Sequence, residues 1–174
     1  MRNIGVCNET PWGLMRYLAL SQGGLPRVAT IQNGYSLLDR RFEQGGLAEV
    51  AMREQVGLLA YSPLAAGQLT GKHLQADGAP DGRMSFPGMA RRYGRPAVAR
   101  AVAGYLDIAR RHGLEPAAMA LAFVRQQPFV TAVLMAASSV AQLKSNLASL
   151  QVTLPREVIK EINAVHDENP SPVR

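Results

Sequence analysis

Short apolar runs alternate along this chain with segments of helical period, four times over. The strand-like runs are "NIGV", "RVATIQ", "VGLLAY" and "FVTAVLMA", and segments with apolar residues three and four apart follow each of them. Thr10 and Pro11 give the first helical segment a cap and a first position. Alternation of this kind predicts parallel strands joined by right-handed helical crossovers, which is an α/β fold.

A final amphipathic segment, "PREVIKEINAVHDE", follows the fourth unit and predicts one extra helix near the C-terminus. Four strands are compatible with a small open sheet or with half of an eight-stranded barrel, whereas a full barrel needs about 250 residues. The 174 residues suffice for one hydrophobic core. We therefore expect a single domain over residues 1–174, with a loose tail at residues 167–174.

The composition indicates in which cellular compartment the chain is expected and which kinds of partner are not expected to bind it. No apolar run is long enough to cross a bilayer, and the N-terminal residues contain no apolar signal-peptide core. The single cysteine, Cys7, has no partner for a disulfide within the chain, which favours a reducing cytoplasm. The net charge of +6 comes from scattered basic residues with few aromatic neighbours, a pattern that argues against nucleic-acid binding.

The third apolar run opens into a loop of small residues. The segment "LLAYSPLAAGQLTGK" passes from a strand through Ser62 and Gly67 to Lys72, and a Gly- and Pro-rich stretch continues to about Arg95. A loop this long in a compact domain is usually functional or disordered. Small residues let a backbone approach a phosphate, which a lysine can neutralise, so the segment predicts either a phosphate-bearing ligand or an ordinary surface turn.

Four motifs, taken together, indicate a family. "IGVCNET", "IQNGYSLLDR", "LLAYSPLAAGQLTGK" and "AASSVAQLKSN" occur in an order and at spacings that closely resemble the C-terminal half of an aldo-keto reductase. The nearest type is that of the bacterial reductases related to potassium-channel beta subunits. That family forms (β/α)8, or TIM, barrels and binds NADP(H) without a G-x-G-x-x-G motif, which is also absent here. The resemblance implies a half barrel of four βα units, strands five to eight, followed by the C-terminal helix.

The resemblance also implies a site for the nicotinamide end of the cofactor. Cys7 and Asn8 match the family's Ser-Asn pair after the fifth strand, and Gln32 matches the glutamine that ends the sixth. Both positions bind the nicotinamide carboxamide, and amide side chains suit it because each offers a donor and an acceptor. Tyr61 matches the aromatic residue that stacks on the nicotinamide ring.

The phosphate and adenosine ends are implied in the same way. The residues that match the pyrophosphate loop and its basic contacts are Ser62, Pro63, Leu64, Gly67, Lys72 and Arg83. Those that match the adenosine end are Ser138, Gln142 and Asn146. Ser138 lies where a helix N-terminus can bind the 2′-phosphate, and Gln142 and Asn146 are four apart and share a helix face.

Two departures and one absence bear on activity. Cys7 replaces the usual serine and loses a hydroxyl hydrogen bond, and Ala136 replaces a glycine and crowds the approaching phosphate. In the family, a tyrosine general acid acts with a lysine, an aspartate and a histidine, all on the first half of the barrel. The 174 residues contain no match for this tetrad, so no catalytic residue is assigned and the isolated chain is expected to be inactive.

Several interpretations remain open beside the family. Tyr61 fits an ordinary strand-end aromatic, Lys72 a surface lysine, and Gln142 a residue facing water. The whole chain fits a piece of an NADP(H)-dependent oxidoreductase, a non-catalytic NADP(H)-binding module, or a basic interaction protein. Half a barrel leaves two open strand edges, so the expected partner is a second copy or a missing N-terminal half.

Overall fold

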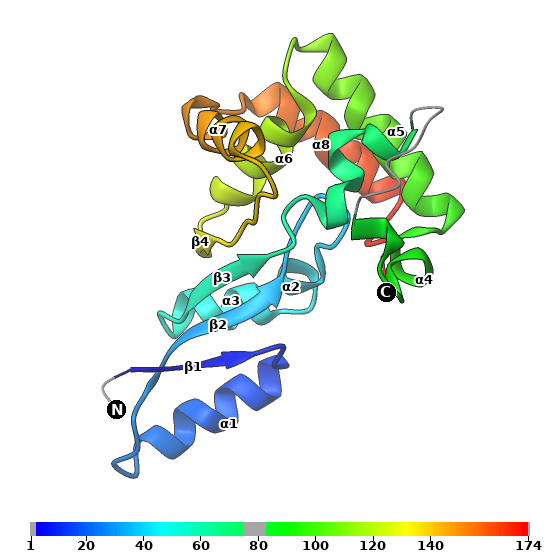
Figure 1. Ribbon diagram of the computed structural model, residues 1–174. Coiled ribbons are helices and arrows are strands. Elements are labelled where there is room, and N and C mark those ends of the chain that lie inside the picture. The colour runs from blue at the N-terminus through cyan, green and yellow to red at the C-terminus, as the bar shows by residue number, and fades with distance from the viewer. Residues whose placement is uncertain (1–2, 75–82, 174) are drawn as a thin grey trace.

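The computed structural model describes residues 3–74 and 83–173 and contains a four-stranded parallel sheet (Figure 1). The strands lie in chain order: β1 (Ile4–Cys7), β2 (Val28–Gly34), β3 (Gly57–Tyr61) and β4 (Val130–Val133). Because every pair is parallel, the four carboxyl ends meet at one edge of the sheet. The predicted α/β class, with four parallel strands alternating with helices, is confirmed.

Helices follow every strand, and the first turn of α1 is capped as the sequence predicts. The Thr10 hydroxyl accepts a hydrogen bond from the backbone N–H of Gly13 at 3.0 Å, with Pro11 at the first helical position. The α-helices are α1 (Pro11–Ser21), α2 (Arg41–Gln44), α3 (Leu47–Arg53), α4 (Met89–Tyr93), α5 (Pro96–Arg111), α6 (Pro116–Arg125), α7 (Val140–Ala148) and α8 (Arg156–Glu168). Short 3₁₀ turns are η1 (Ala65–Thr70), η2 (Lys72–Leu74), η3 (Arg83–Ser85) and η4 (Ser149–Gln151).

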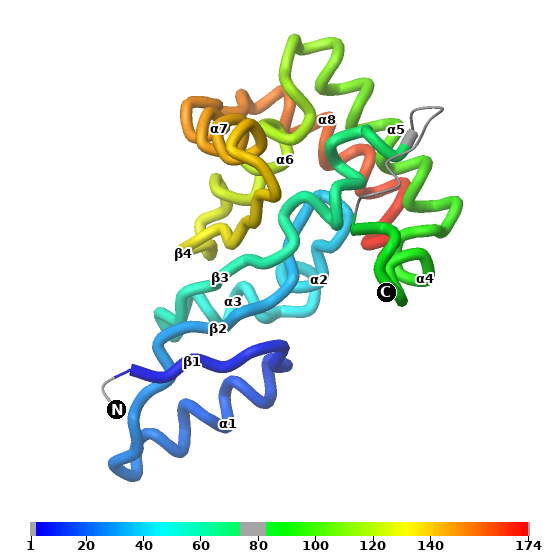
Figure 2. Tube along the Cα trace, in the orientation of Figure 1, coloured from blue at the N-terminus to red at the C-terminus, as the bar shows by residue number. Residues whose placement is uncertain are grey.

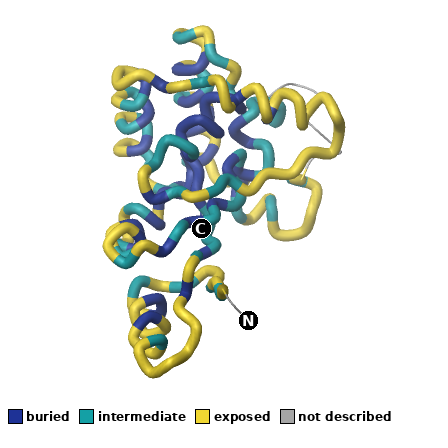
Figure 3. Tube along the Cα trace, turned by 90° about the vertical axis from the view of Figure 1, so that its left-hand side faces the viewer, coloured by how far each residue is buried: buried dark blue, intermediate teal, exposed yellow. Residues whose placement is uncertain are grey.

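The core lies between one face of the sheet and the helices. Ile31, Leu58 and Ala60 are fully buried on this face. The Tyr35 ring meets the Phe129 ring edge-on, with 5.2 Å between their centroids. The trace runs from β1 and α1 at one end of the molecule to α5, α6 and α8 at the other (Figure 2). Buried residues are concentrated in the middle, and the end formed by β1 and α1 is largely exposed (Figure 3).

The opposite face of the sheet is more open. Strand β3 alternates between buried and half-buried residues, so Leu58 is fully buried whereas Leu59 is not. An almost wholly apolar run such as "VGLLAY" is typical of a strand buried on both faces, but β3 is fully buried on only one. Among the described residues, β1 and β4 each pair with only one strand, so the sheet does not close on itself.

Two further expectations differ from the structure. The spacing of Leu143 and Leu147 in α7 is typical of a buried face, but both residues are exposed and Asn146 is buried instead. Residues 167–174 were expected to form a loose tail, yet α8 extends to Glu168 and Val173 is fully buried. The Ser171 hydroxyl fixes this end, because it accepts a hydrogen bond from the backbone N–H of Arg40 at 3.1 Å.

None of the described helices combines the length and the apolar character needed to cross a bilayer.

A buried polar cluster attaches α8 to the rest of the fold. His166 is buried, and its Nε2 lies 2.8 Å from the side-chain nitrogen of Gln44. Within the described residues its Nδ1 is buried without a hydrogen-bond partner. Arg40 lies nearby and is paired with Glu43. Burial, and then the positive charge of Arg40, lower the pKa of His166 from its ordinary 6.5.

This arrangement predicts that acid weakens the fold through His166. The folded state favours the neutral ring, so the unfolded chain takes up the proton first as the pH falls below about 6.5. Between pH 7.5 and 5.5, the free energy of unfolding should fall further in the wild type than in His166→Gln, by up to about 1.4 kcal/mol. Urea titrations at the two pH values measure this difference. Equal losses in both proteins would contradict the assignment to His166.

Candidate cofactor site

The carboxyl ends of β1, β2 and β3 bring three polar side chains and one aromatic ring together. The Tyr61 hydroxyl donates a hydrogen bond to Asn8 Oδ1 at 2.9 Å, and the Asn8 backbone N–H donates to the Gln32 carbonyl at 3.0 Å. The Cys7 thiol donates to Gln32 Oε1 at 3.4 Å. Cys7, Asn8, Gln32 and Tyr61, which are far apart in the sequence, therefore form one group of neighbours.

This group offers the chemistry of an amide-binding surface beside an aromatic face. Gln32 and Asn8 carry carboxamide groups, which pair with another amide as both donor and acceptor. Asn8 adopts a left-handed conformation with φ of 56°, which is uncommon for a residue with a side chain. The arrangement fits a planar ligand that bears an amide.

The loop after β3 contains a cluster of left-handed residues. Ser62, Ala65 and Ala66 have φ of 56°, 50° and 57°, and Gly67 has φ of 89°. Non-glycine residues in this region are strained, and such strain is typical of functional segments held by their surroundings. Here the surroundings include the backbone N–H of Gly67, which donates to the Leu64 carbonyl at 2.9 Å. Ala65 and Leu69 anchor the loop in the core.

Gly67 lies against the side chain of Lys72. A Cβ atom at position 67 would be 2.8 Å from Lys72 Cε and 3.3 Å from its ammonium nitrogen, so any side chain there would displace the lysine. His73 Nε2 lies close to the same point, at 3.4 Å. Burial, and to a lesser degree the charge of Lys72, lower the pKa of His73. The structure thus brings Gly67 and Lys72 together, as a phosphate cradle requires.

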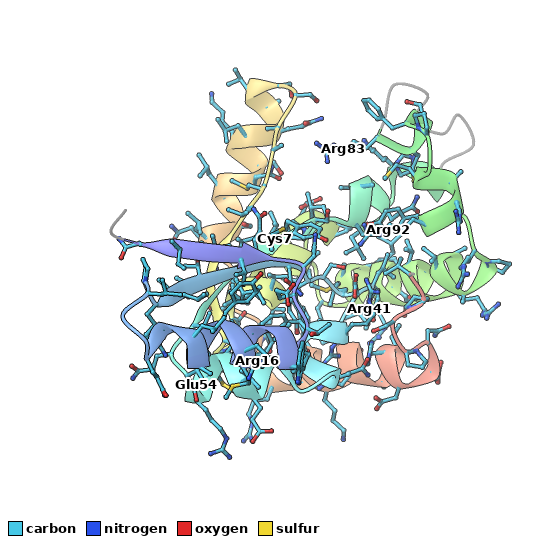
Figure 4. All side chains as sticks on the ribbon, turned by 90° about the horizontal axis from the view of Figure 1, so that it is seen from below. Cys7, Arg16, Arg41, Glu54, Arg83 and Arg92 are labelled. Carbon is cyan, nitrogen blue, oxygen red and sulfur yellow. The ribbon has the colours of Figure 1, made fainter. Side chains whose placement is uncertain are left out.

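Arg83 lies further along the same loop, in η3, and is exposed. Figure 4 shows it on the loop side of the molecule, apart from Cys7 at the end of β1. Part of the loop that was expected to cover the cofactor, residues 75–82, is outside the described residues. Within the described residues, neither Lys72 nor Arg83 has an ion pair with a carboxylate.

Two of the three residues predicted for the adenosine end are hydrogen-bonded to each other, Ser138 in the loop before α7 and Gln142 in its first turn. Gln142 Oε1 accepts hydrogen bonds from the backbone N–H and the hydroxyl of Ser138, at 2.9 and 3.0 Å. Ser139, and not Ser138, is the N-cap of α7, because its hydroxyl accepts from the Gln142 N–H. Asn146 follows Gln142 by about one turn but is buried, so the structure does not place it at the surface with the other two.

A charged cluster beside Tyr61 was missed by the sequence analysis. The Asp39 side chain is only 6% exposed and is paired with two arginines, Arg41 at 2.7 Å and Arg92 at 3.4 Å. The hydrogen bond to Asp39 raises the pKa of Arg41. Asp39 lies inside the motif "IQNGYSLLDR", and Arg41 follows the motif directly. Nothing in the sequence indicates that they meet Arg92, which is more than fifty positions away.

Two further tyrosines, Tyr35 and Tyr93, are buried. Tyr35 is fully buried, and burial followed by its hydrogen bond to Glu43 raises its pKa far above the ordinary value. Tyr93 is 5% exposed, and burial raises its pKa as well. Neither side chain is placed to give a proton to a bound substrate.

Comparisons with known proteins match almost the whole length of the chain. Residues 1–167 match the model of the aldo/keto reductase family. Over 167 residues, or 95% of this chain, the sequence is 53% identical to Protein tas of Escherichia coli K12. An aldo-keto reductase of Babesia bovis is 36% identical over the full chain and 64% of its own length. A probable voltage-gated potassium channel subunit beta of Oryza sativa is 30% identical over 80% of the chain and 44% of its own length.

The match to Protein tas covers 48% of that protein, and the match to the Babesia bovis reductase covers 64%, so the chain spans only about half to two thirds of the length of these relatives. The residues matched by the family model include β1 to β4, the loop after β3 and nearly all of α8. The chain therefore belongs to the aldo/keto reductase family, whose members are NADP(H)-dependent oxidoreductases.

Proposed function

We propose that this chain binds NADP(H) at the carboxyl edge of its sheet. The observation that carries the proposal is the convergence of Asn8, Gln32 and Tyr61, linked by hydrogen bonds of 2.9 and 3.0 Å. Asn8, Gln32 and Cys7 hold the nicotinamide carboxamide, and the Tyr61 ring stacks on the nicotinamide. The loop of left-handed residues from Ser62 to Gly67 holds the pyrophosphate.

The charged groups complete the proposed cofactor site. Lys72 and Arg83 neutralise phosphate, and they are available for this because neither is paired with a carboxylate among the described residues. Ser138 and Gln142 bind the adenosine end, next to the N-terminus of α7, where the helix dipole favours the negative 2′-phosphate. Asn146 is buried and takes part only through the packing of α7.

We also propose that these 174 residues do not reduce carbonyl compounds by themselves. By the family resemblance, the tyrosine acid and its lysine, aspartate and histidine partners belong to the first half of the barrel, for which this sequence has no match. Tyr35 and Tyr93 are buried, and the Tyr61 hydroxyl is already bonded to Asn8. None of these three tyrosines therefore replaces the missing acid. The second candidate is accordingly a non-catalytic NADP(H)-binding or interaction module, as the similarity to a potassium channel subunit beta favours.

The binding proposal predicts a specific role for Tyr61. Replacing Tyr61 with alanine removes the stacking face, so the dissociation constant for NADPH should rise by about fivefold to tenfold. Tyr17→Ala is the matched control, because Tyr17 is an exposed tyrosine on α1, away from the carboxyl edge. Calorimetric titration of the three proteins measures the effect. Equal affinities for the two variants would contradict stacking on Tyr61.

The activity proposal predicts no carbonyl reduction above background. Purified chain mixed with NADPH and 4-nitrobenzaldehyde should leave the absorbance at about 340 nm unchanged, because no general acid is positioned. A full-length aldo-keto reductase serves as the positive control. Steady oxidation of NADPH at an ordinary enzymatic rate, of about 1 per second or more, would overturn the proposal.

We also propose that the open strand edges are covered by a partner, either a second copy or a separate N-terminal half. β1 and β4 are edge strands, and exposed apolar residues flank both of them. Those on α1 are Trp12, Met15 and Leu20, and those on α7 are Val140, Leu143 and Leu147. Two copies related by a twofold axis would pair β4 of one with β1 of the other.

Purified alone, the chain should therefore be at least a dimer at micromolar concentration. Trp12 is 74% exposed beside the β1 edge, so Trp12→Glu should shift the molecule toward the monomer by placing a charge in the interface. Light scattering coupled to size exclusion measures both masses. A monomeric wild type at about 10 μM, a concentration at which specific interfaces are commonly formed, would contradict the second copy.

A further inference from the structure

The buried carboxylate of Asp39 lies where two loops of the candidate site meet. Asp39 belongs to the loop after β2, and its backbone is fixed by hydrogen bonds exchanged with Ser36, each 3.1 Å. Arg41, two residues further along, binds the carboxylate through both its Nε and its terminal nitrogen, at 2.8 and 2.7 Å. Arg92 reaches the same carboxylate at 3.4 Å from α4, which follows the loop after β3.

The two arginines are not equivalent. Arg41 occupies both oxygens of Asp39 in the bidentate manner that stabilises a buried carboxylate, so the charge is compensated without Arg92. Arg41 also connects Asp39 only to its own loop. At 3.4 Å, Arg92 adds little to the neutralisation of the Asp39 carboxylate. It does, however, connect the loop after β2 to α4, two segments that are far apart in the sequence. Its guanidinium also lies over the Tyr93 ring, 5.3 Å from the centroid, and Tyr93 is buried.

The same carboxylate lies next to the nicotinamide end of the site. A Cβ atom on Gly34 would be 3.5 Å from Asp39 Oδ2 and 3.3 Å from two ring atoms of Tyr61. Gly34, having no side chain, therefore lets Asp39 and the Tyr61 ring pack closely from either side. In Figure 4, Arg41 and Arg92 lie beyond Cys7 on one side of the molecule, which agrees with a common location at the carboxyl edge.

We propose that the Arg92–Asp39 ion pair is a link that holds the loop after β3 in its cofactor-binding conformation, which makes Arg92 a positioning residue for NADP(H). The link fastens Arg92, beyond the far end of the loop, to Asp39, which lies close to the Tyr61 ring where the loop begins. The segment between Tyr61 and Arg92 carries Ser62 to Gly67, Lys72 and Arg83. Holding the far end of a loop near its start removes conformations that compete with the strained one. The role in NADP(H) binding rests on the proposed function, whereas the ordering of the loop does not depend on it.

Hydrogen exchange of the ligand-free chain tests the link directly. The backbone N–H groups of Ala65, Gly67 and Gly71 report on the loop, since each donates a hydrogen bond within it, at 2.9 to 3.1 Å. In Arg92→Met these amides should exchange at least about fivefold faster, the change expected when a partly buried pair worth about 1 kcal/mol is lost. In two control variants the exchange rates of these amides should stay within about twofold of the wild-type rates, which is the scatter expected for a substitution that does not affect the loop.

The two controls distinguish loss of the connection between the two segments from loss of positive charge near Asp39 and from general destabilisation of the fold. Arg91→Met changes an exposed arginine next to Arg92 on the same helix. Arg41→Met removes the closer partner of Asp39 but leaves the bridge between the loops intact. Equal acceleration in Arg41→Met would show that neutralisation of Asp39 matters and would overturn the link. Exchange in Arg92→Met equal to that in Arg91→Met would overturn it as well.

Cofactor affinity supplies the second readout. The dissociation constant for NADPH should rise about fivefold in Arg92→Met and stay unchanged in Arg91→Met, with a smaller rise in Arg92→Lys, which retains the charge. If Arg92→Met does not fold, Arg92→Lys carries both measurements. An unchanged affinity in a variant with faster loop exchange would overturn the positioning role. If the wild type itself does not bind NADPH, the proposed function fails, while the exchange result still decides whether the link exists.

Discussion

The parallel register of β1, β2 and β3 is the constraint on which the candidate site depends. Backbone pairing sets Cys7 beside Gln32 and Gln32 beside Leu59, and side chains in register point to the same face. A slip of one residue in β2 would turn Gln32 to the helix-packed face and replace it with Asn33. This pairing sets the positions of the Gln32 side chain, the Tyr61 ring and the loop that follows Tyr61.

The open face and the strained loop are two consequences of the same architecture. Because helices cover only one face of the sheet, Leu59 and Tyr61 on the other face keep partial exposure, where a ligand can reach them. Left-handed residues follow β1 and β3 at this edge, at Asn8 and Ser62. Such conformations cost free energy and persist only where surrounding contacts fix them, as the buried Ala65 and Leu69 do here.

The local sequence pattern predicted the four strands and the Thr10 cap, because those features depend on neighbours a few residues apart. It failed for α7, where Leu143 and Leu147 have the spacing of a buried face but no covering element among the described residues. The four motifs predicted the family, and they named the residues that meet at the carboxyl edge. They could not predict the contact of Asp39 with Arg92, since it depends on how two distant loops fold together.

The most direct test of the cofactor site is to compare backbone amide NMR spectra of the isotope-labelled chain with and without NADPH. The largest shifts should fall at Asn8, at Gln32 and across the loop from Ser62 to Gly67, with a second group near Ser138 at the start of α7. This pattern would establish that the carboxyl edge of the sheet binds the dinucleotide. An unchanged spectrum, or shifts confined to exposed arginines far from that edge, would contradict it.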